Sequence, residues 1–338
     1  MNPTVSILVA AYNEEQHLAE CLESLIGQSY QNLQIVVIDD YSTDSTPQII
    51  KEYSLRDKRI LPLRMPSNCG PAKTRNYGLL QSTGEYVTMV DADDILSADA
   101  ISSAMNCFAE NPDTNCVLFN LQYLMEDGSI VPYKIRSSET VWSGTKAFLL
   151  SLDWSIHGLY VAKMELYRKY PFDMATKLYS DDNTTRLHFL YSGMVRMCQG
   201  IYFYRQYEGN MTNSWNMSRF DLWDANTSMN MTMVRERKNL QEDDPFCDVL
   251  DKAIIIFERQ RWLNLIGVYE YYLEHKQFMS AGERISVIRN FSKTYRSIKK
   301  RLLSKRLRCK PGYIPIRPLF LFRLELRILF LLRRKKSA

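Results

Sequence analysis

The chain has 338 residues, of which 46% are hydrophobic and 24% charged. This composition is typical of a folded globular protein, and the length allows one large domain or two modest ones. Seven cysteines are present, but their number is odd, no two form a C-x-x-C pair and no histidine cluster lies beside them. The pattern argues against a disulfide framework or a zinc site. The first apolar run has no basic segment before it and is too short for a signal peptide, so we expect a cytoplasmic protein.

Strand-like and helix-like patterns alternate over the first 125 residues. In chain order we expect a strand at 5–10, a helix at 13–29, a strand at 33–38, a helix at 47–53, a strand at 60–63, a helix at 71–80, a strand at 86–90, a helix at 98–110 and a strand at 116–123. Strands that are apolar throughout and alternate with helices are typical of a parallel sheet covered on both faces. Ligands of such sheets bind outside the carboxyl ends of the strands.

The second half of the chain has a different organisation. The pattern is mixed from residue 130 to 212, and strand signals vanish beyond Trp215, where segments such as 248–272 and 281–303 have helical periodicity. We therefore expect an α/β domain over residues 1–215 and a helical C-terminal region over residues 216–338.

The charge is distributed unevenly along the chain. Residues 287–338 carry 17 Lys/Arg and a single acid, Glu325, whereas the preceding residues carry 26 basic and 37 acidic side chains. Within this tail, the apolar run 317–332 is interrupted by Arg323, Glu325 and Arg327, so a membrane-spanning helix is not expected. An amphipathic helix that binds the cytoplasmic face of a membrane fits the pattern, as does a terminal helix that packs on the protein itself. No nucleic-acid-binding motif is present.

Two carboxylates, Asp91 and Asp93, follow the apolar strand at 86–90. Carboxylates one residue apart at a strand end can converge on a hard cation such as Mg²⁺ or Mn²⁺. Such a cation would stabilise a diphosphate leaving group. A surface loop whose aspartates cap a helix gives the same short pattern, so the pair alone does not decide between the two.

Three further segments are candidates for a site. Asp39 and Asp40 end the second strand, where they could bind a nucleoside or simply form a turn. The loop and helix at 68–78 place Arg75 near a helix N-terminus, which suits phosphate or a solvated basic face. Asp182 follows Asp181 at the start of a helix, where it is favourable for the helix dipole and is also a candidate general base.

Taken together, these segments resemble the family 2 glycosyltransferases of the GT-A fold. The similar blocks are the opening strand and Y-N turn at 5–14, a V-I-D-D-x-S-T-D-x-T block at 37–46, an N-x-G-x-x-x-x-R-N-x-G block at 68–78, and a G-E-Y strand leading into D-x-D-D at 84–94. The resemblance implies a Rossmann-like α/β fold with a mostly parallel sheet flanked by helices, followed by a helical C-terminal region. It also implies a nucleotide-binding half at 1–125 and an acceptor-side half at 126–215.

The resemblance assigns a role to each matching position. Tyr12, Glu14, Asp40, Arg75 and Asp91 would bind the nucleotide, with Asp39 as a further contact to the base. Asp93 would bind a divalent metal ion, Mn²⁺ or Mg²⁺, and Asp182 would be the catalytic base. Tyr204-Arg205-Gln206 followed by Asn210-Met211-Thr212 is similar to the family's closing segment over the diphosphate.

Three positions depart from the family pattern. Ala11 stands where proline is frequent, and Tyr41 replaces a glycine and would resist a positive φ angle. Asp181 replaces a glutamate, so either Asp181 or Asp182 could point into the site as the base.

The implied function is that of an inverting hexosyl- or N-acetylhexosaminyltransferase. It would move a sugar from a nucleotide-sugar donor, with UDP favoured, to a hydroxyl of a lipid-linked or polysaccharide acceptor at the inner face of the cell membrane. Two alternatives remain open: a non-catalytic nucleotide-sugar-binding module, and a sugar nucleotidyltransferase. The latter class requires a Gly-rich N-terminal phosphate loop, which residues 9–13 lack.

Overall fold

The computed structural model describes residues 2–207, 215–316 and 318–337. The chain divides into two compact units, Met1–Ser214 and Trp215–Ala338. Each unit has its own hydrophobic core and is described by itself.

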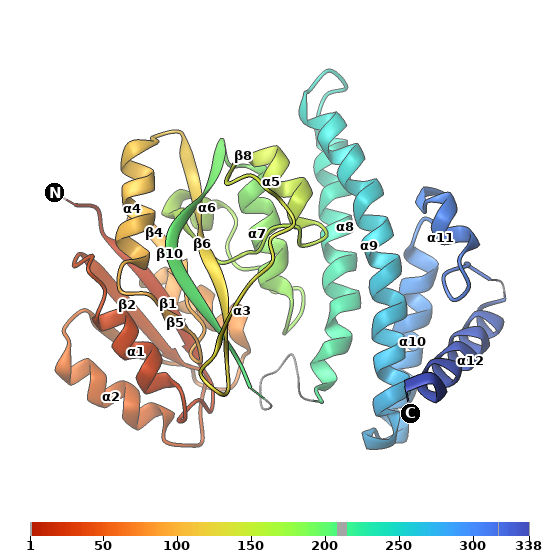
Figure 1. The fold of residues 1–338 in the computed structure, drawn as a ribbon, viewed down its shortest axis with the longest axis horizontal. Helices are drawn as coiled ribbons and strands as arrows, with labels where there is room; N and C mark the ends of the chain where they lie inside the picture. Colours follow the sequence, from red (N-terminus) through yellow and green to blue (C-terminus); the bar gives the residue numbers. More distant parts are fainter. Residues whose placement is uncertain (1, 208–214, 317, 338) are drawn as a thin grey trace. The chain divides into compact units, whose positions relative to one another are not determined.

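The first unit contains one large sheet (Figure 1). Its strands are β1 (Val5–Ala11), β2 (Leu33–Asp39), β3 (Ile60–Arg64), β4 (Tyr86–Met89), β5 (Ile95–Leu96), β6 (Thr114–Met125), β7 (Ile130–Pro132), β8 (Val141–Ser143), β9 (Tyr160–Lys163) and β10 (Met194–Gln206). The strand order is β3-β2-β1-β4-β9-β6-β10-β5, with β7 paired to β6 and β8 to β10. Strands β3, β2, β1 and β4 are parallel, which confirms the expected α/β sheet.

The sheet is less uniformly parallel than the sequence indicates. Strand β9 is antiparallel to both β4 and β6 and separates them, so β4 and β6 do not pair with each other. Strand β9 has only four residues, and its first three are buried. An apolar run this short carries little information on strand direction, which is set by packing between segments distant in the chain.

Helices cover both faces of the sheet (Figure 1). They are α1 (Leu18–Ile26), α2 (Thr46–Arg56), α3 (Pro71–Leu80), α4 (Ala100–Glu110), α5 (Gly144–Ser151), α6 (Met164–Lys169) and α7 (Ser180–Leu190). Side chains of α1, α2 and α4 share one core with alternate residues of β1 and β2. Helix α3 packs on the opposite face, where a Cβ atom on Gly78 would lie 2.6 Å from Cδ1 of Ile38. Glycine therefore lets α3 approach the sheet closely and brings its first turn to the strand ends.

The second unit is helical over its described residues. It contains η1 (Met217–Phe220), α8 (Asp221–Asn239), α9 (Phe246–His275), η2 (Lys276–Phe278), α10 (Ala281–Ser297), η3 (Lys300–Leu302), α11 (Lys305–Cys309) and α12 (Leu319–Ser337). Its core is rich in aromatic side chains, among them Trp223, Trp262, Tyr269, Phe291 and Phe322. Among the helices that the structure describes, none is both long and apolar enough to cross a membrane.

Candidate active site

The candidate site forms where β1, β2 and β4 end. The turn after β1 holds Tyr12 and Glu14 and is tied to the turn after β2 by side chains. Asn13 has a φ of 52°, in the left-handed region that asparagine tolerates, and its Oδ1 accepts a hydrogen bond of 2.9 Å from the backbone N–H of Thr43. Asn13 therefore does not cap a helix, and α1 begins only at Leu18. Tyr12 is 50% exposed, so its ring is accessible to a ligand.

Asp40 is buried and holds the loop that precedes α3. Its two carboxylate oxygens accept hydrogen bonds of 2.8 Å each from the backbone N–H groups of Cys69 and Gly70. Each oxygen keeps a second lone pair, so these bonds leave capacity for a ligand. In the structure, Asp40 therefore positions the loop that precedes α3. The neighbouring Tyr41 does adopt a positive φ, 67°, and the Arg64 guanidinium lies over its ring at 5.5 Å.

Arg75 connects two parts of the site. It projects from α3, is 6% exposed, and forms ion pairs with Asp91 after β4 and, at 3.4 Å, with Asp181 at the start of α7. Burial lowers the pKa of Arg75, but Asp91 and Asp181 raise it by more, so the net pKa is above the ordinary value. Arg75 is thus a permanent cation between the strand end and the helix that carries Asp182.

The carboxylate of Asp93 is the candidate cation ligand. Burial, then the neighbouring charges of Asp91 and Glu14, raise the pKa of Asp93 to about 7. This accumulation of negative charge would be relieved by a bound divalent cation. Among residues 2–207, 215–316 and 318–337, no three His, Cys, Asp or Glu side chains converge as a complete metal site. Mg²⁺ is often bound by one or two carboxylates together with substrate phosphates, so Asp93 fits a metal that arrives with a diphosphate.

Asp93 is contacted by residues that the D-x-D pattern did not predict. The Tyr207 hydroxyl donates to Oδ2 of Asp93 at 3.4 Å, and the Tyr207 ring lies 4.6 Å from that of His17. Arg205 donates from Nε to the Asp93 carbonyl at 2.7 Å and pairs with Glu20 at 2.6 Å. Arg205 belongs to the Y-R-x segment seen in the sequence, whereas nothing local marks Glu20, His17 or Tyr207. Asn210, Met211 and Thr212 lie outside the described residues.

Asp182 lies in the first turn of α7 and is partly buried. Burial raises the pKa of Asp182 to about 7; Arg186 acts to lower it and Asp181 to raise it. Asp181 is engaged elsewhere, because its Oδ2 pairs with Arg75 and its Oδ1 accepts from the Asp182 N–H at 3.1 Å. Of the two acids that the sequence left open, Asp182 is the one not engaged with Arg75.

Asn76 holds the segment that leads to Asp182. Its Nδ2 donates to the Phe172 carbonyl at 2.8 Å, and its Oδ1 accepts from the Phe172 N–H at 2.9 Å. Lys177 donates to Oδ1 of Asn68 at 2.9 Å, so the loop before α3 also contacts this segment. The block at 68–78 thereby positions the acid after β4 through Arg75 and the start of α7 through Asn76.

His157 and Trp154 lie in the chain between the D-x-D segment and Asp182, and each is held by contacts within the protein. His157 is buried, which lowers its pKa to about 4, and its Nδ1 accepts from the Leu159 N–H at 3.2 Å. Trp154 lies under the Arg186 guanidinium at 4.9 Å and has a φ of 59°.

Comparison with known proteins decides the family. The sequence profile described as Glycosyl transferase family 2 matches residues 6–174, half of the chain. The chain belongs to this family. Glycosyltransferase GlyG of Streptococcus pneumoniae is 26% identical over 84% of the chain and 93% of its own length. Glycosyltransferase GlyA of the same organism is 30% identical over 62% of the chain, which spans only 32% of GlyA.

Solved structures share the fold. TarS 1–349 of S. aureus, in complex with UDP-GlcNAc, has a TM-score of 0.70 with 20% identity and is matched over 97% of this chain and 89% of its own. The mannosyltransferase PcManGT of Pyrobaculum calidifontis, in complex with GDP-Man and Mn²⁺, has a TM-score of 0.53 with 17% identity over 98% and 88%. The fold prediction is therefore confirmed, and the protein is a glycosyltransferase.

Proposed function

We propose that this glycosyltransferase moves a sugar from a UDP-sugar to an acceptor hydroxyl, with Asp182 as the base and with inversion at the anomeric carbon. The observation that carries the proposal is the Asp91–Arg75–Asp181 connection, which joins the end of β4 to the helix that bears Asp182. The UDP-GlcNAc complex of TarS, a protein of the same fold, supports UDP as the nucleotide to test first.

The donor site would be formed by Tyr12, Glu14, Asp40, Arg75 and Asp91. Tyr12 is exposed and offers an aromatic face for the base, and Arg75 is a buried cation beside the strand end. Residues 1–125 would form this nucleotide-binding half and residues 126–215 the acceptor-side half. Asp93 would hold Mn²⁺ or Mg²⁺, which would neutralise charge on the diphosphate when bound.

The reaction would be a single displacement. The acceptor hydroxyl loses its proton to the Asp182 carboxylate while its oxygen forms a bond to the anomeric carbon, and the bond from that carbon to the diphosphate oxygen breaks. One displacement inverts the configuration, and the proton stays on Asp182. A general base works best when its pKa lies near the operating pH, and the pKa of Asp182 is about 7.

The acceptor would be lipid-linked or a polysaccharide, reached from the cytoplasmic face of a membrane through α12. This helix buries Phe322 and Leu326 in the core of the second unit, and its only acid, Glu325, accepts from the Gly312 N–H at 3.0 Å. The exposed large apolar side chains of α12 are Phe320, Leu321, Leu324, Ile328, Leu331 and Leu332. An apolar surface with cations and no exposed acid is suited to a bilayer with anionic lipids.

The decisive test combines nucleotide binding with transfer. We expect UDP with Mn²⁺ to raise the melting temperature, because a ligand at 100 times its dissociation constant stabilises the folded state by about 2.7 kcal/mol. Asp93→Asn should abolish the part of this rise in melting temperature that depends on Mn²⁺. Asp113→Asn should not, because Asp113 is an exposed acid that pairs with Arg196. UDP-sugar turnover should fall by about 10²–10⁴-fold in Asp182→Asn while UDP binding persists. Absence of stabilisation by any nucleotide would overturn the donor site.

A further inference from the structure

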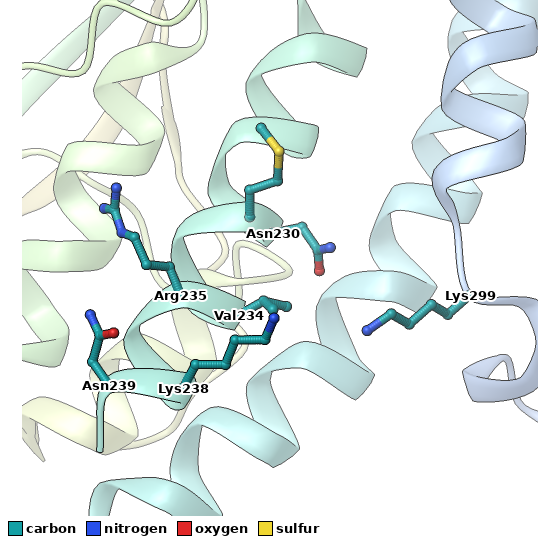
Figure 2. Close-up of a pocket in the computed structure, with 7 residues that line it drawn as sticks. Asn230, Val234, Arg235, Lys238, Asn239 and Lys299 are labelled. Carbon is teal, nitrogen blue, oxygen red and sulfur yellow. The ribbon is translucent and has the colours of Figure 1, made fainter.

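The helical unit contains a pocket that is lined by none of the proposed donor-site residues. It has a volume of about 420 Å³ and is lined by residues of α8 and by Lys299, which follows α10 (Figure 2). Ligand pockets commonly measure about 300–1,000 Å³, so a small molecule or one unit of a polymer fits. All of its lining residues belong to the unit at 215–338, so the pocket does not depend on the proposed donor site.

The charged side chains that line the pocket are all basic. Arg235 and Lys238 project from α8, and Lys299 comes from a different segment of the chain. The helix dipole favours a cation in the last turn of a helix, which explains a lysine at position 238 at the end of α8. The dipole of α8 does not explain Lys299, which comes from another segment and adds its charge to the same pocket. Arg235 pairs with Glu236 at 3.6 Å, so the argument rests on Lys238 and Lys299, which meet no acid among the lining residues. These two cations favour an anionic ligand, and phosphate is the anion that lysine commonly binds as a point charge.

The segment that carries Lys299 is held in place by a buried polar network. The Lys299 N–H donates to Oε2 of Glu258 at 3.4 Å, and Glu258 pairs with Arg261 at 3.0 Å, both on α9. Arg261 in turn donates to Thr227 on α8 at 3.2 Å and to Ser297 at the end of α10 at 2.7 Å. The network therefore links α8, α9 and the end of α10, and it positions Lys299 relative to α8.

A buried amide provides a second, independent indication of a ligand. Asn230 lines the pocket and is 8% exposed, yet its Oδ1 accepts no hydrogen bond from the residues that the structure describes. A buried polar atom without a partner destabilises the folded state, and a donor on a ligand would remove this cost. In Figure 2 the Asn230 amide and the Lys299 and Lys238 ammonium groups extend into the same space.

We propose that this pocket binds a phosphate ester that also carries hydroxyl groups, such as a sugar phosphate or polyol phosphate. The phosphate would lie between Lys238 and Lys299, and a neighbouring hydroxyl would donate to Oδ1 of Asn230. Arg235 extends away from Lys299 in Figure 2 and pairs with Glu236, so it is not needed for the phosphate contact. The exposed Met231 and the partly buried Val234 complete an apolar wall against which the carbon skeleton of the ligand can pack.

Calorimetric titration of the full chain with glucose 6-phosphate at low salt tests the proposal. We expect Lys238→Gln/Lys299→Gln to weaken binding about tenfold or more, since each lost contact is a charge-assisted hydrogen bond. The matched control Lys276→Gln/Arg289→Gln removes two exposed charges of the same unit outside the pocket and should leave binding unchanged. Equal weakening in both variants, or no binding to the unaltered chain, would overturn the proposal.

Further titrations address the hydroxyl contact and the source of the ligand. Inorganic phosphate should bind more weakly than glucose 6-phosphate, and Asn230→Ala should remove this difference; equal affinities in the unaltered chain would refute the hydroxyl contact. Glycerophosphoinositol, a soluble diester, serves as the second ligand. Tighter binding of the diester would indicate a polymer or lipid headgroup, and tighter binding of the monoester a free sugar phosphate. Asp93→Asn should retain glucose 6-phosphate binding. Loss of UDP binding in this variant would therefore bear on the donor site and not on the pocket in the helical unit.

Discussion

Arg75 on α3 forms an ion pair with Asp91 at the end of β4, although 16 positions separate the two residues in the chain. The same guanidinium reaches Asp181, 106 positions away. One buried cation thus connects a residue proposed to bind the donor with the helix that carries the proposed base. Removal of the cation should therefore affect both stability and catalysis.

Replacement of Arg75 by glutamine should destabilise the protein by about 2–4 kcal/mol. Loss of one partner of a buried pair typically costs about 3–5 kcal/mol, and Asp91 and Asp181 are each about a third exposed, which lets water reduce the cost. Urea unfolding monitored by circular dichroism measures this change. Lys146→Gln is the control, because Lys146 and its partner Glu139 are each half exposed and their pair should contribute less than about 1 kcal/mol. Equal effects of the two substitutions would contradict the bridging role.

The pH dependence of turnover should report the ionisation of Asp182. Because the base must be deprotonated, kcat at saturating donor and metal should rise about tenfold per pH unit below about pH 7 and level off above it. Asp182→Asn should lower kcat by about 10²–10⁴-fold and remove this limb. A kcat that does not change between about pH 5.5 and 8 would contradict the assignment.

The contribution of Asp182 to stability should fall as pH rises, whereas kcat should increase. The pKa of Asp182 is about 7 in the folded state and is ordinarily 3.8, so the folded state binds this proton more tightly than the unfolded state. The stability that the proton contributes is present below the unfolded-state pKa and is lost as pH rises to about 7. Asp182→Asn should therefore unfold at a higher temperature than the unaltered chain above pH 7, with a smaller difference near pH 4. Differential scanning calorimetry at both pH values measures the two differences.

The parts of this site that the sequence predicts are those carried by local pattern. Strands β1, β2 and β4 are apolar runs, so the positions of Tyr12, Asp40 and Asp91 at strand ends followed from the sequence. The hydrogen bond from Tyr207 to Asp93 and the contact of Glu20 with Arg205 did not follow from the sequence, because each joins residues more than 100 positions apart. The hydrogen bonds of Asp40 to the loop before α3 did not follow from the sequence either, since they depend on how that loop folds back.

The presence of a helical C-terminal region followed from periodicity, but the environment of its terminal helix did not. The sequence left open whether the terminal helix packs on the protein or faces a membrane. In the structure, Phe322 and Leu326 are buried in the unit, while Leu324 and Ile328 are each 49% exposed. One face packs and another remains exposed, so the two interpretations are compatible.

Asn76→Ala should reduce both stability and turnover. The substitution leaves the N–H and carbonyl of Phe172 without their partner, at a cost of about 1–3 kcal/mol for each group that stays buried. It also frees the segment before α7, so Asp182 would be positioned less well. Asn76→Asp keeps the acceptor for the Phe172 N–H and should retain more stability than Asn76→Ala. Urea unfolding and kcat, measured on both variants, test this order; a fall in stability without any change in kcat would show that Asn76 does not position the base.

Binding of the unaltered chain to vesicles that contain anionic phospholipid should depend on the outer face of α12. Leu324→Glu/Ile328→Glu places two acids on this face and should reduce co-sedimentation with vesicles by about tenfold or more, since each buried apolar side chain contributes about 1.5–3 kcal/mol. The matched control is Ile255→Glu/Ile285→Glu, at positions that are 49% and 61% exposed on α9 and α10. Both variants introduce the same charge into the same unit. Equal loss of binding in both would mean that net charge, and not α12, controls attachment. High salt should weaken but not abolish binding of the unaltered chain, because the apolar contribution is not screened.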